Sequence, residues 1–134
     1  MPIQEESTVI IADDLTGAND TALQFFKSGI STKIVIDSNY DFNNSEIEDF
    51  GVWAFSTETR NLPKEQALEI IIETTKKLQS NLGSKNFYKK IDSTLRGNVG
   101  IEVVALLEIL EKDLAIVAPA YIEENRTTIG AYQL

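Results

Sequence analysis

Short apolar runs alternate with longer stretches of helical periodicity along nearly the whole chain. Five runs are rich in β-branched or aromatic residues and predict strands at 8–12, 32–37, 51–56, 86–91 and 114–119. Three stretches with apolar residues at i, i+3 and i+4 predict helices at 19–29, 63–81 and 99–112. Because strands and helices alternate, we expect an α/β fold with three layers, in which helices cover both faces of a mostly parallel, Rossmann-like sheet. The segment 40–50 is predicted to be a polar connection.

Polar and charged residues gather in the segments that follow the predicted strands. They are Asp13, Asp14 and Thr16; Ser56, Thr57, Glu58 and Arg60; Asp92, Ser93, Thr94, Arg96 and Asn98; and Asn125 to Thr128. Parallel sheets bind ligands outside the carboxyl ends of their strands. All three arginines of the chain fall in these loops, and Lys90 lies at the end of a strand. Guanidinium groups recognise carboxylates and phosphates, so this edge is predicted to bind a small anion.

The adjacent Asp13 and Asp14 have several possible roles. Aspartate is a favoured N-cap, and a helix is expected to begin within a few residues. Capping explains one carboxylate better than two, because neighbouring like charges repel. A phosphoacceptor receiver domain needs a further aspartate after its third strand, where this chain has Ser56 and Thr57. A haloacid-dehalogenase-type site needs Asp-x-Asp, and here Leu15 takes the place of the second aspartate.

The stretch YKKIDSTLRGN, residues 88–98, combines cations, hydroxyls and a carboxylate. Alternate strand residues share a face, which places Lys90 and Asp92 together. Such a set of groups suits a polyhydroxylated anion, although a solvated turn would have a similar composition. Neither the GxGxxG nor the GxxxxGK[ST] nucleotide-binding motif occurs in the chain.

The composition narrows the chemistry further. The chain of 134 residues contains neither cysteine nor histidine, so acid–base work must fall to Asp, Glu, Lys or Tyr. A formal net charge of −9 argues against general nucleic-acid binding. No apolar run approaches the roughly 20 residues of a membrane span, and the N-terminus is unlike a targeting peptide. We expect a cytoplasmic protein that contacts neither membrane nor nucleic acid.

Four segments together resemble the N-terminal domain of the four-carbon acid sugar kinases. They are IADDLTGANDTA, STETR, YKKIDSTLRGNVGIE and APAYIEENRTTIGAYQL. The resemblance implies that residues 1–134 are the sugar-acid-binding domain of a two-domain kinase, as an incomplete domain. ATP and Mg²⁺ are expected mainly from a C-terminal domain that is absent from this chain, and the enzyme could form a homo-oligomer. The family phosphorylates the terminal hydroxyl of threonate, erythronate or 3-oxo-tetronate.

Carried over residue by residue, the resemblance implies both substrate-binding and catalytic positions. The substrate-binding residues would be Asp13, Asp14, Arg60, Lys90, Asp92, Ser93 and Arg96. Asp14 and Asp92 are the candidates for catalysis, and no residue is assigned to a metal. Two departures from the family pattern are the Ile129–Gly130–Ala131 stretch, where an Asn-Gly step is usual, and the end of the chain at Leu134.

Two other hypotheses remain open at this point. The chain could bind a small carboxylate without catalysing a reaction. Less favoured is a Mg²⁺-dependent phosphoacceptor that uses Asp13 and Asp14.

Overall fold

The computed structural model describes residues 7–37, 39–42, 47, 49–83 and 86–134. The elements are β1 (Thr8–Ala12), α1 (Leu15–Lys27), β2 (Thr32–Val35), β3 (Val52–Ser56), α3 (Lys64–Leu82), β4 (Asn86–Lys90), α4 (Val99–Ile109), the 3-10 turn η1 (Ile122–Glu124), β5 (Thr128–Ile129) and β6 (Tyr132–Gln133). Within the described residues, no helix is both long and apolar enough to cross a membrane.

The main sheet has four parallel strands in the order β2-β3-β1-β4. Ala12 at the end of β1 pairs with Ser56 of β3 and with Lys90 of β4, so these three strands end at one level. The chain leaves β1 toward β2 and leaves β3 in the opposite direction toward β4. This reversal marks the edge above β1 and β3 as the place where doubly wound sheets bind ligands.

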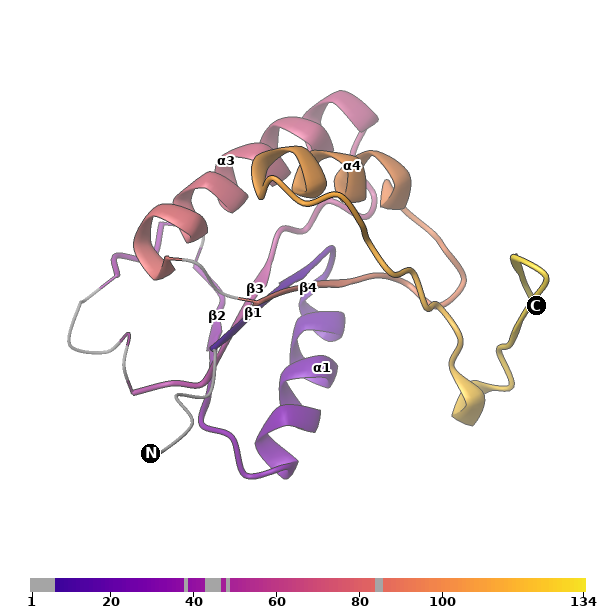
Figure 1. Cartoon of the computed structure of the whole chain (residues 1–134), viewed down its shortest axis with the longest axis horizontal. Helices are drawn as coiled ribbons and strands as arrows, with labels where there is room; N and C mark the ends of the chain where they lie inside the picture. Colours follow the sequence, from indigo (N-terminus) through magenta and orange to yellow (C-terminus); the bar gives the residue numbers. More distant parts are fainter. Residues whose placement is uncertain (1–6, 38, 43–46, 48, 84–85) are drawn as a thin grey trace.

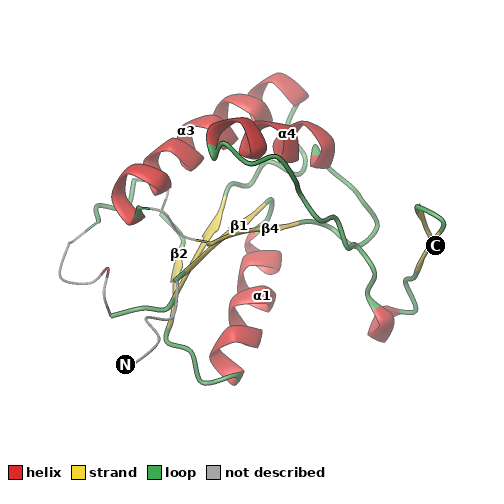
Figure 2. Ribbon diagram, viewed as in Figure 1, coloured by secondary structure: helices red, strands yellow, loops and turns green. Residues whose placement is uncertain are grey.

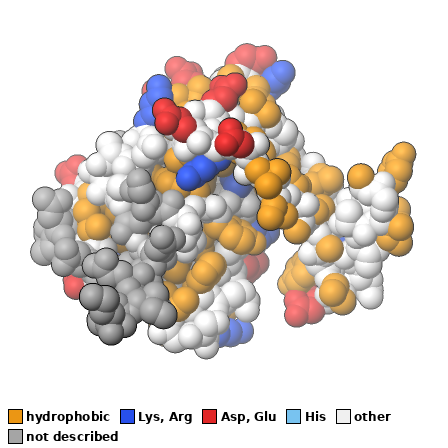
Figure 3. Space-filling view, in the orientation of Figure 1, with side chains coloured by type: hydrophobic (Ala, Val, Ile, Leu, Met, Phe, Trp, Pro, Cys, Tyr) orange, Lys and Arg blue, Asp and Glu red, His pale blue; other side chains and the backbone are white. Residues whose placement is uncertain are grey.

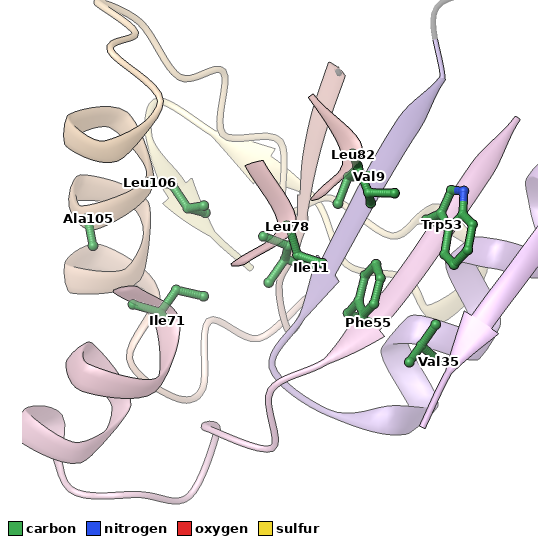
Figure 4. Close-up of a cluster of buried hydrophobic side chains, with 10 residues drawn as sticks. All are labelled: Val9, Ile11, Val35, Trp53, Phe55, Ile71, Leu78, Leu82, Ala105 and Leu106. Carbon is green, nitrogen blue, oxygen red and sulfur yellow. The ribbon is translucent and has the colours of Figure 1, made fainter. Parts of the chain in front are cut away.

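Helices cover both faces of the sheet (Figures 1 and 2). Helices α3 and α4 lie side by side over one face, and α1 covers the other. Successive strand residues point to opposite faces, so Val9 and Ile11 pack toward α3 and α4, whereas Ile10 packs toward α1. Figure 4 shows the larger core cluster, in which the stacked rings of Trp53 and Phe55 lie next to the aliphatic side chains.

The predicted α/β architecture is confirmed, and most element boundaries agree within a few residues. Helix α1 begins at Leu15 rather than at the predicted residue 19, because the Asp14 side chain accepts a hydrogen bond from Gly17 N–H and caps the helix earlier. The predicted connection 40–50 lies partly outside the described residues. The chain after Asn125 forms a short β5–β6 hairpin that was not predicted from the sequence.

The predicted fifth strand at 114–119 is wrong. This segment has no ladder partner among the residues that the structure describes, and Leu114 and Ile116 are 76% and 88% exposed. Its hydrophobic pattern resembles that of a buried strand, but a strand also needs a neighbour with which to exchange backbone hydrogen bonds.

Candidate functional site

Asp13 and Asp14 lie in the tight turn between β1 and α1 and have different surroundings. Asp13 is 2% exposed, whereas the Asp14 side chain is 24% exposed. One oxygen of Asp14 caps α1 at 2.8 Å from Gly17 N, which confirms the capping role that the sequence suggested for one of the pair. The other oxygen of Asp14 and both oxygens of Asp13 face Arg60.

Arg60 follows β3 and bridges the two aspartates. Its Nε and Nη2 donate to the two oxygens of Asp13 at 3.0 and 2.8 Å, and its Nη1 donates to Asp14. The hydrogen bond to Asp13 is the largest cause that raises the pKa of Arg60. These three bonds involve three of the five guanidinium N–H groups. Arg60 therefore neutralises the repulsion between the aspartates and keeps further donors for an anion.

A second carboxylate–guanidinium pair follows β4. Asp92 is 7% exposed and accepts from Arg96 Nε at 2.8 Å and from Nη2 at 3.0 Å. The side-chain hydrogen bond from Arg96, with further bonds from Thr94 and the Arg96 backbone, holds the pKa of Asp92 well below its usual value. The Arg96 side chain is 69% exposed, so it can reach a ligand while it remains paired with Asp92.

The remaining predicted residues border these two pairs. Lys90 Nζ donates to the Ile91 carbonyl at 2.7 Å, and its side chain packs close to Gly17. Ser93 Oγ accepts from Arg126 Nη1 at 2.6 Å. The third arginine therefore approaches the β4 loop.

The two arginine loops are packed tightly against each other. Gly97 has φ +92°, and a Cβ there would lie 3.2 Å from Asp13 Oδ2 and 3.3 Å from Arg60 Cα. Glu58 and Leu95, one in each loop, also have positive φ. Non-glycine residues in this conformation often mark functional loops, which agrees with a ligand site at this edge.

A buried polar group beneath these loops was not predicted from the sequence. Glu102 of α4 is 1% exposed, pairs with Lys89 at 2.7 Å and accepts from Thr59 Oγ1 at 2.6 Å. A signal was present, because Glu102 lies in the otherwise apolar stretch VGIEVVALL. A lone carboxylate on a helix face that should be buried requires a partner.

A large groove lies beside the carboxylate–arginine pairs of Arg60 and Arg96 rather than over them. This groove of about 1040 Å³ runs between the edge of β4 and the segment 114–121, and it reaches Lys90 and Ser93 at one end. Figure 3 shows hydrophobic side chains exposed on the C-terminal part that borders it. Among residues 7–37, 39–42, 47, 49–83 and 86–134, no group of three or more acidic side chains is arranged to hold a metal ion.

Fold and site define an α/β domain that presents paired carboxylates and arginines at the carboxyl edge of a parallel sheet. A family model described as the sugar-binding N-terminal domain matches residues 8–134, and the chain belongs to this family. The chain is 36% identical over 121 residues to a D-threonate kinase of Salmonella typhimurium, covering 90% of this chain and 28% of that protein. It is 39% identical over 132 residues to a D-erythronate kinase of Heliobacterium modesticaldum, covering 96% and 29%.

A solved structure has the same fold. It is a domain of unknown function from Bordetella bronchiseptica with bound citrate, described as a domain-swapped dimer. It matches with a TM-score of 0.86 and 30% identity, over 96% of this chain and 33% of that chain. The predicted relationship to the four-carbon acid sugar kinases is confirmed, and the chain spans less than a third of the length of these two curated relatives.

Proposed function

We propose that this chain is the sugar-acid-binding part of an ATP-dependent kinase that phosphorylates the terminal hydroxyl of a four-carbon sugar acid. The substrate belongs to the threonate, erythronate or 3-oxo-tetronate type. The observation that carries the proposal is the meeting of Asp13, Asp14 and Arg60 above β1 and β3. Relatives named D-threonate and D-erythronate kinase support the choice of substrate.

The substrate carboxylate would bind to arginine donors that the aspartates leave free. Arg60 uses three of its N–H groups on Asp13 and Asp14, and Arg96 uses two side-chain groups on Asp92. Lys90 adds a positive charge at the end of β4. Because three aspartates offset these cations, the site suits a ligand that carries hydroxyls as well as one carboxylate. The bound citrate in the Bordetella structure, a hydroxylated carboxylate, supports this class of ligand.

Of the two candidate catalytic residues, Asp14 and Asp92, Asp14 is the better candidate for accepting a proton from the attacking hydroxyl. The lowered pKa of Asp92 makes that carboxylate a weak base, and the Arg96 guanidinium binds both of its oxygens. Asp14 has only one oxygen on a guanidinium, that of Arg60, and the other on Gly17 N–H. We assign Asp92 to positioning Arg96 and the hydroxyls. Phosphoryl transfer relies mainly on positioning and charge stabilisation, so these roles are sufficient for this half of the site.

ATP and Mg²⁺ are assigned to another part of a longer protein. The sequence has no glycine-rich nucleotide motif, and the described residues provide no cluster of acidic ligands for a metal. The part that this chain plays is therefore to bind and orient the sugar acid. The alternative functions remain a non-catalytic carboxylate-binding chain or a phosphoacceptor that uses Asp13 and Asp14.

Calorimetric titration with D-threonate and D-erythronate tests the binding part of this proposal. Succinate lacks hydroxyls and erythritol lacks a carboxylate, so both should bind at least about tenfold more weakly, equivalent to about 1.4 kcal/mol. Arg60→Met and Arg96→Met should weaken binding of the acids, whereas Lys27→Met at the far end of α1 should not. Equal affinity in all variants would show that the site is elsewhere.

Catalysis is tested separately on the full-length gene product with ATP and Mg²⁺. Phosphorylation of the terminal hydroxyl supports the kinase. Binding without phosphate transfer supports the non-catalytic alternative, and labelling of Asp13 or Asp14 by acetyl phosphate supports the phosphoacceptor.

We also propose that the protein self-associates. The Bordetella neighbour is described as a domain-swapped dimer, and in this chain the apolar segment 114–117 is exposed beside the edge of β4, which has no further strand paired to it among the described residues. Light scattering coupled to size-exclusion chromatography should report a species larger than the monomer, and Ile116→Ser should shift it toward the monomer. A strictly monomeric protein at high concentration would contradict this.

A further inference from the structure

A buried ion pair lies beneath the loop that carries Arg60. Lys89 Nζ and Glu102 Oε2 are 2.7 Å apart, and their side chains are 9% and 1% exposed. A charge this deep is unfavourable unless it is paired and hydrogen-bonded. The ion pair therefore fixes the first turn of helix α4 against β4. The second carboxylate oxygen of Glu102 accepts a hydrogen bond from another side chain.

That partner is a hydroxyl relay. Thr59 Oγ1 lies 2.6 Å from Glu102 Oε1, and Thr57 Oγ1 lies 2.8 Å from Thr59 Oγ1. Each hydroxyl has one proton, and the carboxylate can only accept. Thr59 therefore donates to Glu102. The single proton of Thr57 is shared between Thr59 Oγ1 and the Ala12 carbonyl oxygen, which lies 3.0 Å away, so the relay also reaches the end of β1.

The relay fixes the backbone on the N-terminal side of Arg60. Thr59 immediately precedes Arg60 and is 0% exposed. Asn98 Nδ2 donates to the Thr59 carbonyl at 3.1 Å, and Arg60 N–H donates to the Asp13 carbonyl at 3.2 Å. The guanidinium thus extends toward the aspartates from a backbone that is held on both sides.

We propose that Thr59 and Glu102 are positioning residues that set the orientation of Arg60 for the sugar acid. The inference rests on the proposed function, but the orientation of Arg60 can be measured without any ligand. Neither residue touches the substrate, because Thr59 and Glu102 are both buried below the loop. They act through the backbone of Arg60.

The ligand-free experiment follows the Nε–H signal of Arg60 by NMR. The chain has only three arginines, so Arg60→Lys assigns the signal. Thr59→Val keeps the shape of the side chain but removes its hydroxyl, and Thr75→Val is the matched control. Thr75 is also 0% exposed, and its hydroxyl bonds to the Ile71 carbonyl within α3, away from the site.

Thr59→Val should speed solvent exchange of the Arg60 Nε–H by about tenfold relative to Thr75→Val, as expected when a hydrogen-bonded support is lost. Thr59→Ser keeps the hydroxyl and should restore slow exchange. If Thr59→Val does not fold, Thr57→Val removes the outer hydroxyl, with its contacts to Thr59 and to the Ala12 carbonyl, and should change exchange in the same direction. Exchange equal to that of Thr75→Val overturns the inference.

The same variants are then titrated with D-threonate and D-erythronate. Thr59→Val and Glu102→Gln should weaken binding about tenfold, whereas Thr59→Ser and Thr75→Val should stay within about threefold of the wild type. Unchanged affinity in Thr59→Val overturns the inference. If Arg60 exchange responds but no variant, the wild type included, binds a sugar acid, then the positioning role holds and the proposed substrate is wrong.

Discussion

Asp13→Asn is the most direct test of the bridge between Arg60 and the two aspartates. Asp13 is 2% exposed, and both of its oxygens accept from Arg60. Asparagine has the same shape but only one accepting oxygen, and its amide would face a guanidinium N–H. The substitution therefore removes one charge-assisted hydrogen bond and places the new amide N–H group against an N–H group of Arg60.

The expected loss follows from these contacts. A hydrogen bond to a charged group contributes about 1.5–3 kcal/mol, and breaking a fully buried pair costs about 3–5 kcal/mol. Arg60 is 15% exposed and keeps its bond to Asp14, so the lower part of this range applies. We expect Asp13→Asn to lower the free energy of unfolding by about 2–3 kcal/mol.

Urea denaturation followed by fluorescence measures this difference. The chain has one tryptophan, Trp53, which is 0% exposed and therefore reports on the core. Asp14→Asn keeps the helix cap and should cost only about 1 kcal/mol, and Asp20→Asn on the exposed face of α1 should change stability by less than about 0.5 kcal/mol. The bridge is refuted as a stabilising contact if Asp13→Asn destabilises no more than Asp20→Asn does.

The same structure leads to three further predictions. Gly17→Ala should destabilise the protein in urea denaturation, because its Cβ would lie 2.7 Å from Asp14 Oδ1. Gly100→Ala, with nothing within 4 Å of the added Cβ, should stabilise helix α4 by about 0.5–1 kcal/mol in the same assay. Folding lowers the pKa of Asp92, so the charged carboxylate stabilises the fold above its unfolded pKa of about 3.9. The stability advantage of the wild type over Asp92→Asn should therefore shrink as the pH falls from about 4 to 2. A stability difference that does not change with pH would contradict this. Ile116→Ser should change the unfolding free energy of the monomer by less than about 0.5 kcal/mol, since Ile116 is 88% exposed. A core substitution such as Ile71→Ala is expected to cost about 2–5 kcal/mol. A loss of that size for Ile116→Ser would mean that 114–119 is a buried strand after all.

Most of the geometry of the candidate site could be predicted because its residues follow strands. In a parallel sheet the carboxyl ends meet at one edge, so Asp13, Arg60 and Asp92 had to approach one another once the strands were recognised. Their partners could not be predicted in the same way. Asp13 and Arg60 are separated by 47 positions, and only the packing of two loops brings their oxygens and nitrogens within 3.0 Å.

The sequence by itself determined the alternation of strands and helices, a helix cap by one of the two adjacent aspartates, and the family. These features depend on local periodicity, local hydrogen bonds and short motifs. Tertiary structure alone decided three other features. Segment 114–119 has a strand's pattern but no neighbouring strand among the described residues, Arg60 is shared between two aspartates, and Glu102 is buried against Lys89. Each depends on what lies beside a residue in space, which hydrophobic and polar periodicity along a chain does not specify.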